Sequence, residues 1–340
     1  MSQVSNLRHR DIVVMAASAG GVEVLRDLLS RLPGNLPASV LVVLHIPATS
    51  GGALASILDR SGPLAAATAL DGEALRHGRV YVAPPDRHLL LTDDRIELSH
   101  GPRQNGHRPA ADPLFTSAAA VAGPRVLGVV LSGTLDDGAL GAAAIEQSGG
   151  LVAVQDPAES PYTGMPQAAL AATARPEILT SAGIAALITR QSREQVPSGI
   201  PPACGDPGHL AGKLSHPDPP AQDPPGEWSG LTCPECGGPL DYDTEVAPGR
   251  YECRLGHGWS PASLVDSHSA AVEQALWAAA LRLDERIRLM TRMADEAGQR
   301  GHPLSATHFR EAARESQNAL VTIRGLLERA VVPPAQQEEF

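Results

Sequence analysis

Ser18, His45 and the pair Asp136-Asp137 each follow a run of apolar residues that is typical of a buried strand. A serine hydroxyl is a weak nucleophile until an imidazole base takes its proton, and a carboxylate can orient that imidazole and stabilise its protonated form. These residue types are therefore the ones that an acyl-transfer enzyme requires. They can act together only if the fold brings them to one place.

Ser18 lies in a stretch of small residues, Ser18-Ala19-Gly20-Gly21, between a strand-like run and a segment with apolar residues at helical spacing. This pattern predicts a strand, a tight turn and a helix. The start of the helix leaves free N–H groups beside the hydroxyl, so Ala19 and Gly20 are candidates for stabilising an oxyanion. The same turn could equally bind a phosphate, and the stretch alone does not decide between the two.

Residues 11 to about 190 alternate strand-like and helix-like segments, which predicts an α/β fold with a doubly wound, mostly parallel sheet. The strands are expected at 12–15, 40–44, 80–82, 89–91, 126–131 and 151–154, and the helices at 22–31, 52–60, 113–122, 139–147 and 166–172. The stretch from Val80 to Ser99 suggests an antiparallel hairpin attached to this sheet. Because the carboxyl ends of parallel strands share one edge, Ser18, His45 and an aspartate can converge there.

Each of these residues also has a structural interpretation. A serine in such a turn is more often a helix cap, a histidine after a buried strand is usually structural, and Asp-Gly is a common turn. The chain order Ser, His, Asp also differs from the order Ser, Asp, His of α/β-hydrolases, and Ala16 replaces the first glycine of their nucleophile motif. Their shared placement at three strand ends gives catalysis about the same weight as these structural interpretations.

Residues 11 to about 188 resemble the catalytic domain of the bacterial chemotaxis protein-glutamate methylesterase family, of the CheB type. The matching blocks are 18–21, 45–47, 80–88, 108–115, 131–138, 155–157 and 164–166. The resemblance implies that Ser18 is the nucleophile and His45 the general base. It assigns the orienting acid to Asp137, which directly precedes a glycine, rather than to Asp136. No cofactor is expected for this catalysis.

The resemblance further implies that Ala19, Gly20, Thr134 and Arg108 line or brace the substrate and oxyanion side of the site. Some relatives have Thr and Met at the positions of Ala19 and Thr134, a difference that would alter the substrate pocket. For Arg108 a surface charge near a helix start is the alternative interpretation. No receiver domain precedes the first strand at Ile12, so we expect phosphorylation control within the chain to be absent.

A second motif consists of Cys233-x2-Cys236, 16 intervening residues, and Cys253-x3-His257. Three thiolates and one imidazole suit a closed tetrahedral zinc site, which favours a structural metal over a catalytic one. The alternative is a Cys-x2-Cys redox pair, which the downstream Cys253 and His257 disfavour. Certain standalone relatives of the methylesterase family resemble this chain here too, with a zinc ribbon and a helical tail.

We therefore expect four parts: a CheB-type catalytic domain over 8–190, a proline-rich linker over 191–227, a zinc ribbon over 228–261 and a helical hairpin or coiled coil over 262–331. Nine prolines between Val196 and Pro225 favour the linker, in which Cys204 has no nearby ligand partner. Apolar or small residues form one stripe at 272, 276, 279, 283, 287, 290 and 293, and another at 309, 313, 316, 320, 323, 327 and 330.

The formal net charge of −11 argues against nucleic-acid binding, and no apolar run has the length of an export signal or a membrane span. We expect a cytoplasmic hydrolase that removes methyl esters from glutamate side chains of chemoreceptor-like helices and also deamidates glutamine. The helical tail could dock such a helix or mediate self-association. The alternatives are a weakly active or non-enzymatic signalling adaptor and an esterase for another ester.

Overall fold

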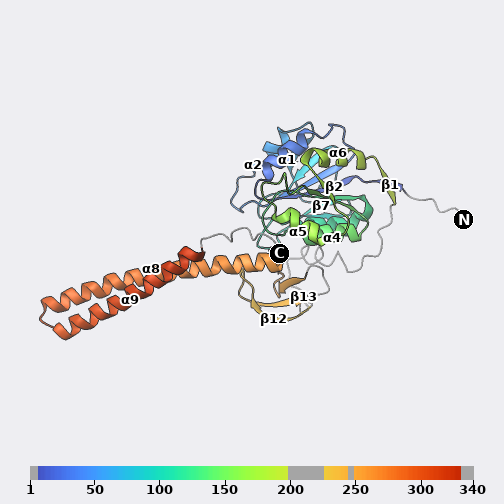
Figure 1. The fold of residues 1–340 in the computed structure, drawn as a ribbon. Coiled ribbons are helices and arrows are strands. Elements are labelled where there is room, and N and C mark those ends of the chain that lie inside the picture. The colour runs from blue at the N-terminus through green and yellow to red at the C-terminus, as the bar shows by residue number, and fades with distance from the viewer. Residues whose placement is uncertain (1–6, 198–225, 244–248, 331–340) are drawn as a thin grey trace. The chain divides into compact units, whose positions relative to one another are not determined.

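Figure 1 shows the computed structural model of the protein, which describes residues 7–197, 226–243 and 249–330. The chain forms two compact units that divide after Leu264. The expected linker lies mostly outside the described residues, as does Cys204. The first residues of the range expected for it belong to the end of α6 and to the short strand β11 (Gln195–Pro197), which pairs antiparallel with β1 (Leu7–His9).

A seven-stranded sheet forms the centre of the first unit, in the order β10-β9-β8-β2-β3-β5-β4. Its strands are β2 (Ile12–Ala17), β3 (Ser39–Leu44), β4 (Ala65–Thr68), β5 (Arg79–Val82), β8 (Val126–Val130), β9 (Leu151–Gln155) and β10 (Glu177–Leu179). Every pair in it is parallel. The α/β prediction is confirmed. Because β2 lies between β8 and β3, the residues that follow these three strands share one edge.

Helices cover both faces of the sheet (Figure 1). One face carries α1 (Gly21–Ser30), α2 (Ala53–Asp59) and α6 (Ser181–Gln191), and the other carries α3 (Ala111–Ala122), α4 (Ala139–Gln147) and α5 (Gly164–Ala172). Successive side chains of β2 point to opposite faces of the sheet, so this strand packs against both helix layers. Val13 and Met15 pack on the first face, and Val14 and Ala16 pack on the second. A short 3₁₀ turn, Gly123–Arg125, leads from α3 into β8.

The expected hairpin is shorter than the stretch that suggested it. Residues 79–82 form β5, a parallel strand of the main sheet, and only β6 (His88–Thr92) and β7 (Arg95–Ser99) pair antiparallel, in a sheet of their own. Pro84 and Pro85 separate β5 from β6, because proline cannot donate to a strand ladder. Asp93 and Asp94 form the hairpin turn with φ of 48° and 59°, the left-handed pair that a type I′ turn requires.

A four-stranded antiparallel sheet completes the first unit, and we refer to residues 226–264 as the ribbon. It consists of β12 (Glu227–Thr232), β13 (Pro239–Asp243), β14 (Arg250–Cys253) and β15 (Gly258–Trp259), in that order. Its small core is built from Leu240, Trp259 and Leu264, together with two buried cysteines.

The second unit consists of the main part of α8 (Pro261–Gln299) and of α9 (Pro303–Ala330), and Figure 1 shows the chain turning back between them. Except for 272, which is exposed, and 330, whose burial is not described, the expected stripe positions are buried or half-buried, whereas most of their neighbours are exposed. This burial matches two helices that face each other along these stripes. No helix among the described residues is long and apolar enough to cross a membrane.

Candidate active site

The structure brings Ser18, His45 and Asp137 together at the carboxyl edge of the sheet. Ser18 is the first residue after β2 and His45 the first after β3. Nδ1 of His45 lies 3.1 Å from Oγ of Ser18, and its Nε2 lies 2.6 Å from Oδ2 of Asp137. The side chains of His45 and Asp137 are 6% and 2% exposed. This arrangement leaves an acceptor nitrogen facing the serine hydroxyl when Nε2 carries the proton.

Asp137 is fixed by donors other than His45. Its carboxylate accepts the N–H groups of Ala111 at 2.6 Å and Asp112 at 3.3 Å, at the start of α3, where a helix favours negative charge. Burial alone would raise the pKa of Asp137. The hydrogen bond and charge of His45, together with the Ala111 N–H, outweigh burial and hold that pKa below its usual range. Asp137 is therefore ionised beside His45.

Two neighbouring carboxyl groups have different partners. Oδ1 of Asp136 accepts the hydroxyl of Ser260 at 2.7 Å, whereas Nε2 of His45 pairs with Asp137. Asp112 is buried and accepts the N–H groups of Gly138 at 3.0 Å and Gly141 at 2.8 Å. Burial and the charge of Asp137 raise the pKa of Asp112 well above its usual value. Asp112 is therefore harder to ionise than Asp137.

Hydrogen bonds from the loop that follows β8 hold the turn that follows β2. The N–H of Ser18 donates to the carbonyl of Ser132 at 2.9 Å, and the Ser132 hydroxyl donates to the carbonyl of Ala19 at 2.8 Å. Gly20 has a φ of 71° and directly precedes α1. Gly133 passes so close that a Cβ on it would lie 2.9 Å from Cβ of Ser18, so only glycine fits there.

The remaining predicted residues differ in their surroundings. Thr134 is exposed on the loop that follows β8. Arg108 donates to Asp86 at 2.7 Å and to the carbonyl of Gly101 at 2.8 Å, and only 14% of its side chain is exposed. Arg108 braces the loop before α3, and a contact of either residue with substrate stays a prediction.

Two residues beside the site were not singled out from the sequence. The ring of His107 stacks on that of His45, with centroids 3.8 Å apart and planes 13° apart. Burial, followed by the nearness of His45, lowers the pKa of His107 to about 4, so its ring is neutral at pH 7. The buried Asn105 donates from Nδ2 to Asp137 at 3.1 Å. His107 directly precedes the matching block 108–115, so the sequence could have drawn attention to it. The dipeptide Asn105-Gly106 predicts only a turn.

A comparison with family models matches residues 13–188, just over half of the chain, to the CheB methylesterase family. The chain belongs to the CheB methylesterase family. A protein-glutamate methylesterase/protein-glutamine glutaminase of Xanthomonas euvesicatoria pv. vesicatoria is 40% identical over 172 residues, which are 49% of this chain and 48% of the relative. This chain thus spans about half the length of such relatives.

Two further comparisons cover nearly the whole of the matching protein. A putative protein-glutamate methylesterase/protein-glutamine glutaminase of Leptospira interrogans is 36% identical over 181 residues, 53% of this chain and 94% of the relative. The crystal structure of the CheB methylesterase catalytic domain of Thermotoga maritima is 31% identical, covers 53% of this chain and 97% of that domain, and superposes with a TM-score of 0.50. The CheB methylesterase match ends before the ribbon.

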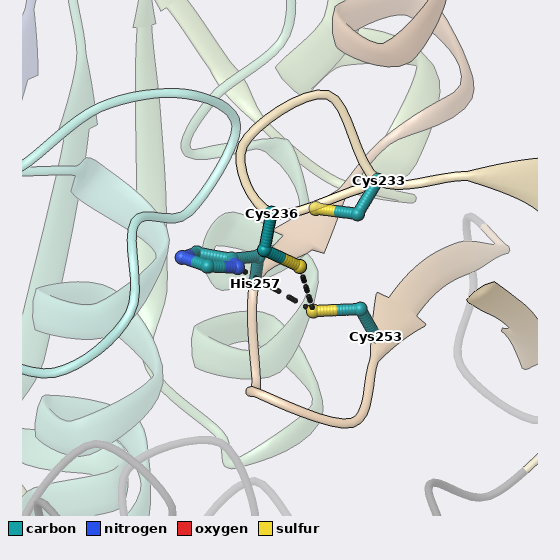
Figure 2. A group of neighbouring side chains, drawn as sticks. All are labelled: Cys233, Cys236, Cys253 and His257. Atoms are coloured by element: carbon teal, nitrogen blue, oxygen red, sulfur yellow. Dashed lines mark hydrogen bonds between the residues drawn. The ribbon is translucent and has the colours of Figure 1, made fainter. Parts of the chain in front are cut away.

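The four candidate metal ligands of the ribbon lie together. Ligand atoms of Cys233, Cys236, Cys253 and His257 are all within 4.8 Å of one another, so the cluster could hold a metal ion. Figure 2 shows the side chains of Cys236 and His257 directed toward Cys253. Sγ of Cys236 lies 3.7 Å from Sγ of Cys253, close to the separation of about 3.8 Å that tetrahedral zinc–sulfur bonds of about 2.3 Å give.

Two tight turns present these ligands. The N–H of Gly237 donates to the carbonyl of Cys233, and the N–H of Gly256 donates to the carbonyl of Cys253, each at 2.8 Å. Both glycines have a positive φ, of 70° and 82°, which allows the chain to turn back behind each cysteine. A hydrogen bond with the Cys253 thiol lowers the pKa of Cys233, so its thiolate, the form that binds metal, is favoured.

Proposed function

We propose that this protein is a serine hydrolase that removes methyl esters from glutamate side chains of methylated, chemoreceptor-like helices and deamidates glutamine in the same way. The observation that carries the proposal is the continuous hydrogen-bonded line from Ser18 through His45 to Asp137. The substrate class comes from the relatives, which are protein-glutamate methylesterases and protein-glutamine glutaminases.

In this proposal Oγ of Ser18 attacks the ester carbonyl while Nδ1 of His45 takes the hydroxyl proton. Asp137 stabilises the imidazolium that forms, and the N–H groups of Ala19 and Gly20 stabilise the oxyanion. The carbon–oxygen bond to the methoxy group then breaks, and His45 returns its proton to release methanol. Water, activated by the same imidazole, hydrolyses the acyl-enzyme to glutamate. An amide substrate follows the same path and releases ammonia.

The ribbon is proposed to hold a structural zinc ion through Cys233, Cys236, Cys253 and His257. All four positions of a tetrahedral site are then filled by protein, which leaves none for a substrate. The metal would supply folding energy to a sheet whose own core is small.

The partners and location are proposals as well. Methylated receptor helices would be the substrate, and the protein would act in the cytoplasm, where such helices present their methylated side chains. Self-association through α8 and α9 stays a prediction. The alternative of a non-enzymatic adaptor is disfavoured because a binding module has no need of the Ser18–His45 hydrogen bond.

The test is release of methanol from methyl-labelled chemoreceptor by the full chain and by Ser18→Ala. We expect turnover by the unaltered protein and a loss of at least about 10⁴-fold in the variant, since the nucleophile is gone. Equal rates for the two proteins, with the variant folded, would refute the proposed mechanism. An unaltered protein that releases no methanol would favour the adaptor.

A further inference from the structure

Asn105 connects the proposed active site to the ribbon with the two ends of one amide. Its Nδ2 donates to Oδ1 of Asp137 at 3.1 Å and to Oδ2 of Asp112 at 3.2 Å. Its Oδ1 accepts the N–H of Ser260 at 2.9 Å and the hydroxyl of Ser263 at 3.1 Å. Asn105 is 5% exposed, so losing one of these partners leaves a buried polar group short of a hydrogen bond.

The ribbon is joined to the loop that carries Asn105 by its backbone too. The N–H of Asn105 donates to the carbonyl of Gly258 at 2.8 Å. The neighbouring Gln104, fully buried, donates to the carbonyl of Gly256 at 3.0 Å and accepts a hydrogen bond from Arg250. Gly256 and Gly258 flank the candidate ligand His257, so one turn of the ribbon both presents a metal ligand and holds this loop.

A second connection runs through Asp136. The hydroxyl of Ser260 donates to its carboxylate at 2.7 Å, one residue before Asp137. Ser260 and Ser263 also bond each other reciprocally at the start of α8, with N–H to hydroxyl distances of 3.1 and 3.0 Å, which is the geometry of a helix cap. The cavity between Asn105, Asp136 and Ser260 measures about 10 Å³, roughly the room for one water molecule.

We propose that Ser260 and Ser263 of the ribbon are positioning residues for the hydrolase site, acting through Asn105 and Asp136 on Asp137. A consequence is that metal binding by the ribbon and the geometry of the His45–Asp137 pair are linked. The proposal rests on the proposed function for its effect on turnover, but the positioning itself does not depend on which substrate is cleaved. Under this proposal the ribbon helps to set the geometry of the hydrolase site and is not only a separate binding module.

The expected effect lies in turnover rather than in substrate binding. With both hydroxyls removed, Oδ1 of Asn105 keeps only the N–H of Ser260 as a ribbon donor, and Asp136 loses its bond to Ser260. The carboxylate of Asp137, which Asn105 contacts, is then held less exactly against His45. A displacement of a fraction of an ångström at such a group typically costs about 10- to 100-fold in rate. We expect this loss in kcat with KM little changed.

The experiment compares the full chain with Ser260→Ala/Ser263→Ala, using methyl-labelled chemoreceptor as substrate. Ser269→Ala is the matched control, because its hydroxyl only bonds the carbonyl of Val265 within the same helix. Ser260→Thr keeps a hydroxyl cap and should retain turnover. Zinc content, measured for each protein, reports whether the ribbon is still folded. If the double variant loses zinc, Ser263→Ala, which removes a single bond to Asn105, takes its place.

A second readout is independent of activity. Because His45 Nε2 and Asp137 Oδ2 lie 2.6 Å apart, we expect the proton between them to give a far-downfield NMR signal in the resting protein. We expect this signal to shift or broaden in Ser260→Ala/Ser263→Ala and on removal of zinc by a chelator. An unchanged signal together with an unchanged kcat would overturn the proposal. A protein that releases no methanol, yet whose signal responds to the ribbon, would contradict the proposed function and leave the positioning intact.

Discussion

His88 is fully buried, and His107, two residues after Asn105, is half-buried. Burial lowers the pKa of each to about 4, from 6.5 in the unfolded chain. Nε2 of His88 donates to the carbonyl of Pro102 at 3.0 Å, which fixes its neutral tautomer. Between about pH 6.5 and pH 4, these two imidazoles therefore bind protons in the unfolded chain but stay neutral in the folded protein.

The stability of the first unit should fall as the pH drops from about 6.5 toward 4, because only the unfolded chain gains these protons. Between pH 7 and 5 each histidine accounts for about 2 kcal/mol of the loss. In His88→Gln the amide can still donate to Pro102 but does not titrate. The free energy of unfolding, measured with urea at pH 7 and pH 5, should therefore decrease by about 2 kcal/mol less than in the unaltered protein. The exposed His9→Gln is the control. A drop of unchanged size in His88→Gln would contradict this account.

At the scale of single residues, the sequence was most informative where a side chain follows a strand directly. The apolar runs before Ser18 and His45 placed both residues at strand ends, but their roles, and the choice of Asp137 over Asp136, came from the family resemblance. Asn105 could not be found in this way, because its partners Ser260 and Ser263 lie more than 150 positions away. Its importance comes from contacts, and the local pattern of Asn-Gly predicts only a turn.

At the scale of elements, continuous β-branched strands were predictable and small or short ones were not. Val40–Leu44 reads as a strand at once, whereas Ala65–Thr68 is built almost wholly from alanine and has little strand propensity. Glu177–Leu179 has only three residues, and the missed helix Ser181–Gln191 follows it directly. These elements form because the sheet and its core accommodate them.

The ribbon offers a direct test at this scale. Purified protein should contain about one zinc ion per chain, and Cys253→Ser should lose it, because three ligands hold the ion far less tightly than four. Cys204→Ser, which lies outside the described residues, is the matched control and should keep the metal. Zinc is measured by atomic emission against protein concentration. Stoichiometric zinc in Cys253→Ser, or none in the unaltered chain, would contradict the proposed ligand set.

At the scale of the whole molecule, the match to the CheB methylesterase family covers residues 13–188, and the ribbon and the two long helices follow it. The ribbon is part of the same compact unit as the seven-stranded sheet, and the helices beyond Leu264 form a unit of their own. The motif predicted the ribbon, but only the folded chain shows that its last strand contacts the loop beside Asp137.

The central claim is that Ser18 is activated by the line through His45 to Asp137. The most direct measurement is the rate at which a fluorophosphonate probe labels the full chain, with the labelled residue located by peptide mass spectrometry. We predict a single adduct on Ser18, formed about 10³- to 10⁴-fold more slowly in Asp137→Asn and at an unchanged rate in Asp93→Asn at the exposed hairpin turn. An adduct on another serine, or equal rates in the two aspartate variants, would contradict the account.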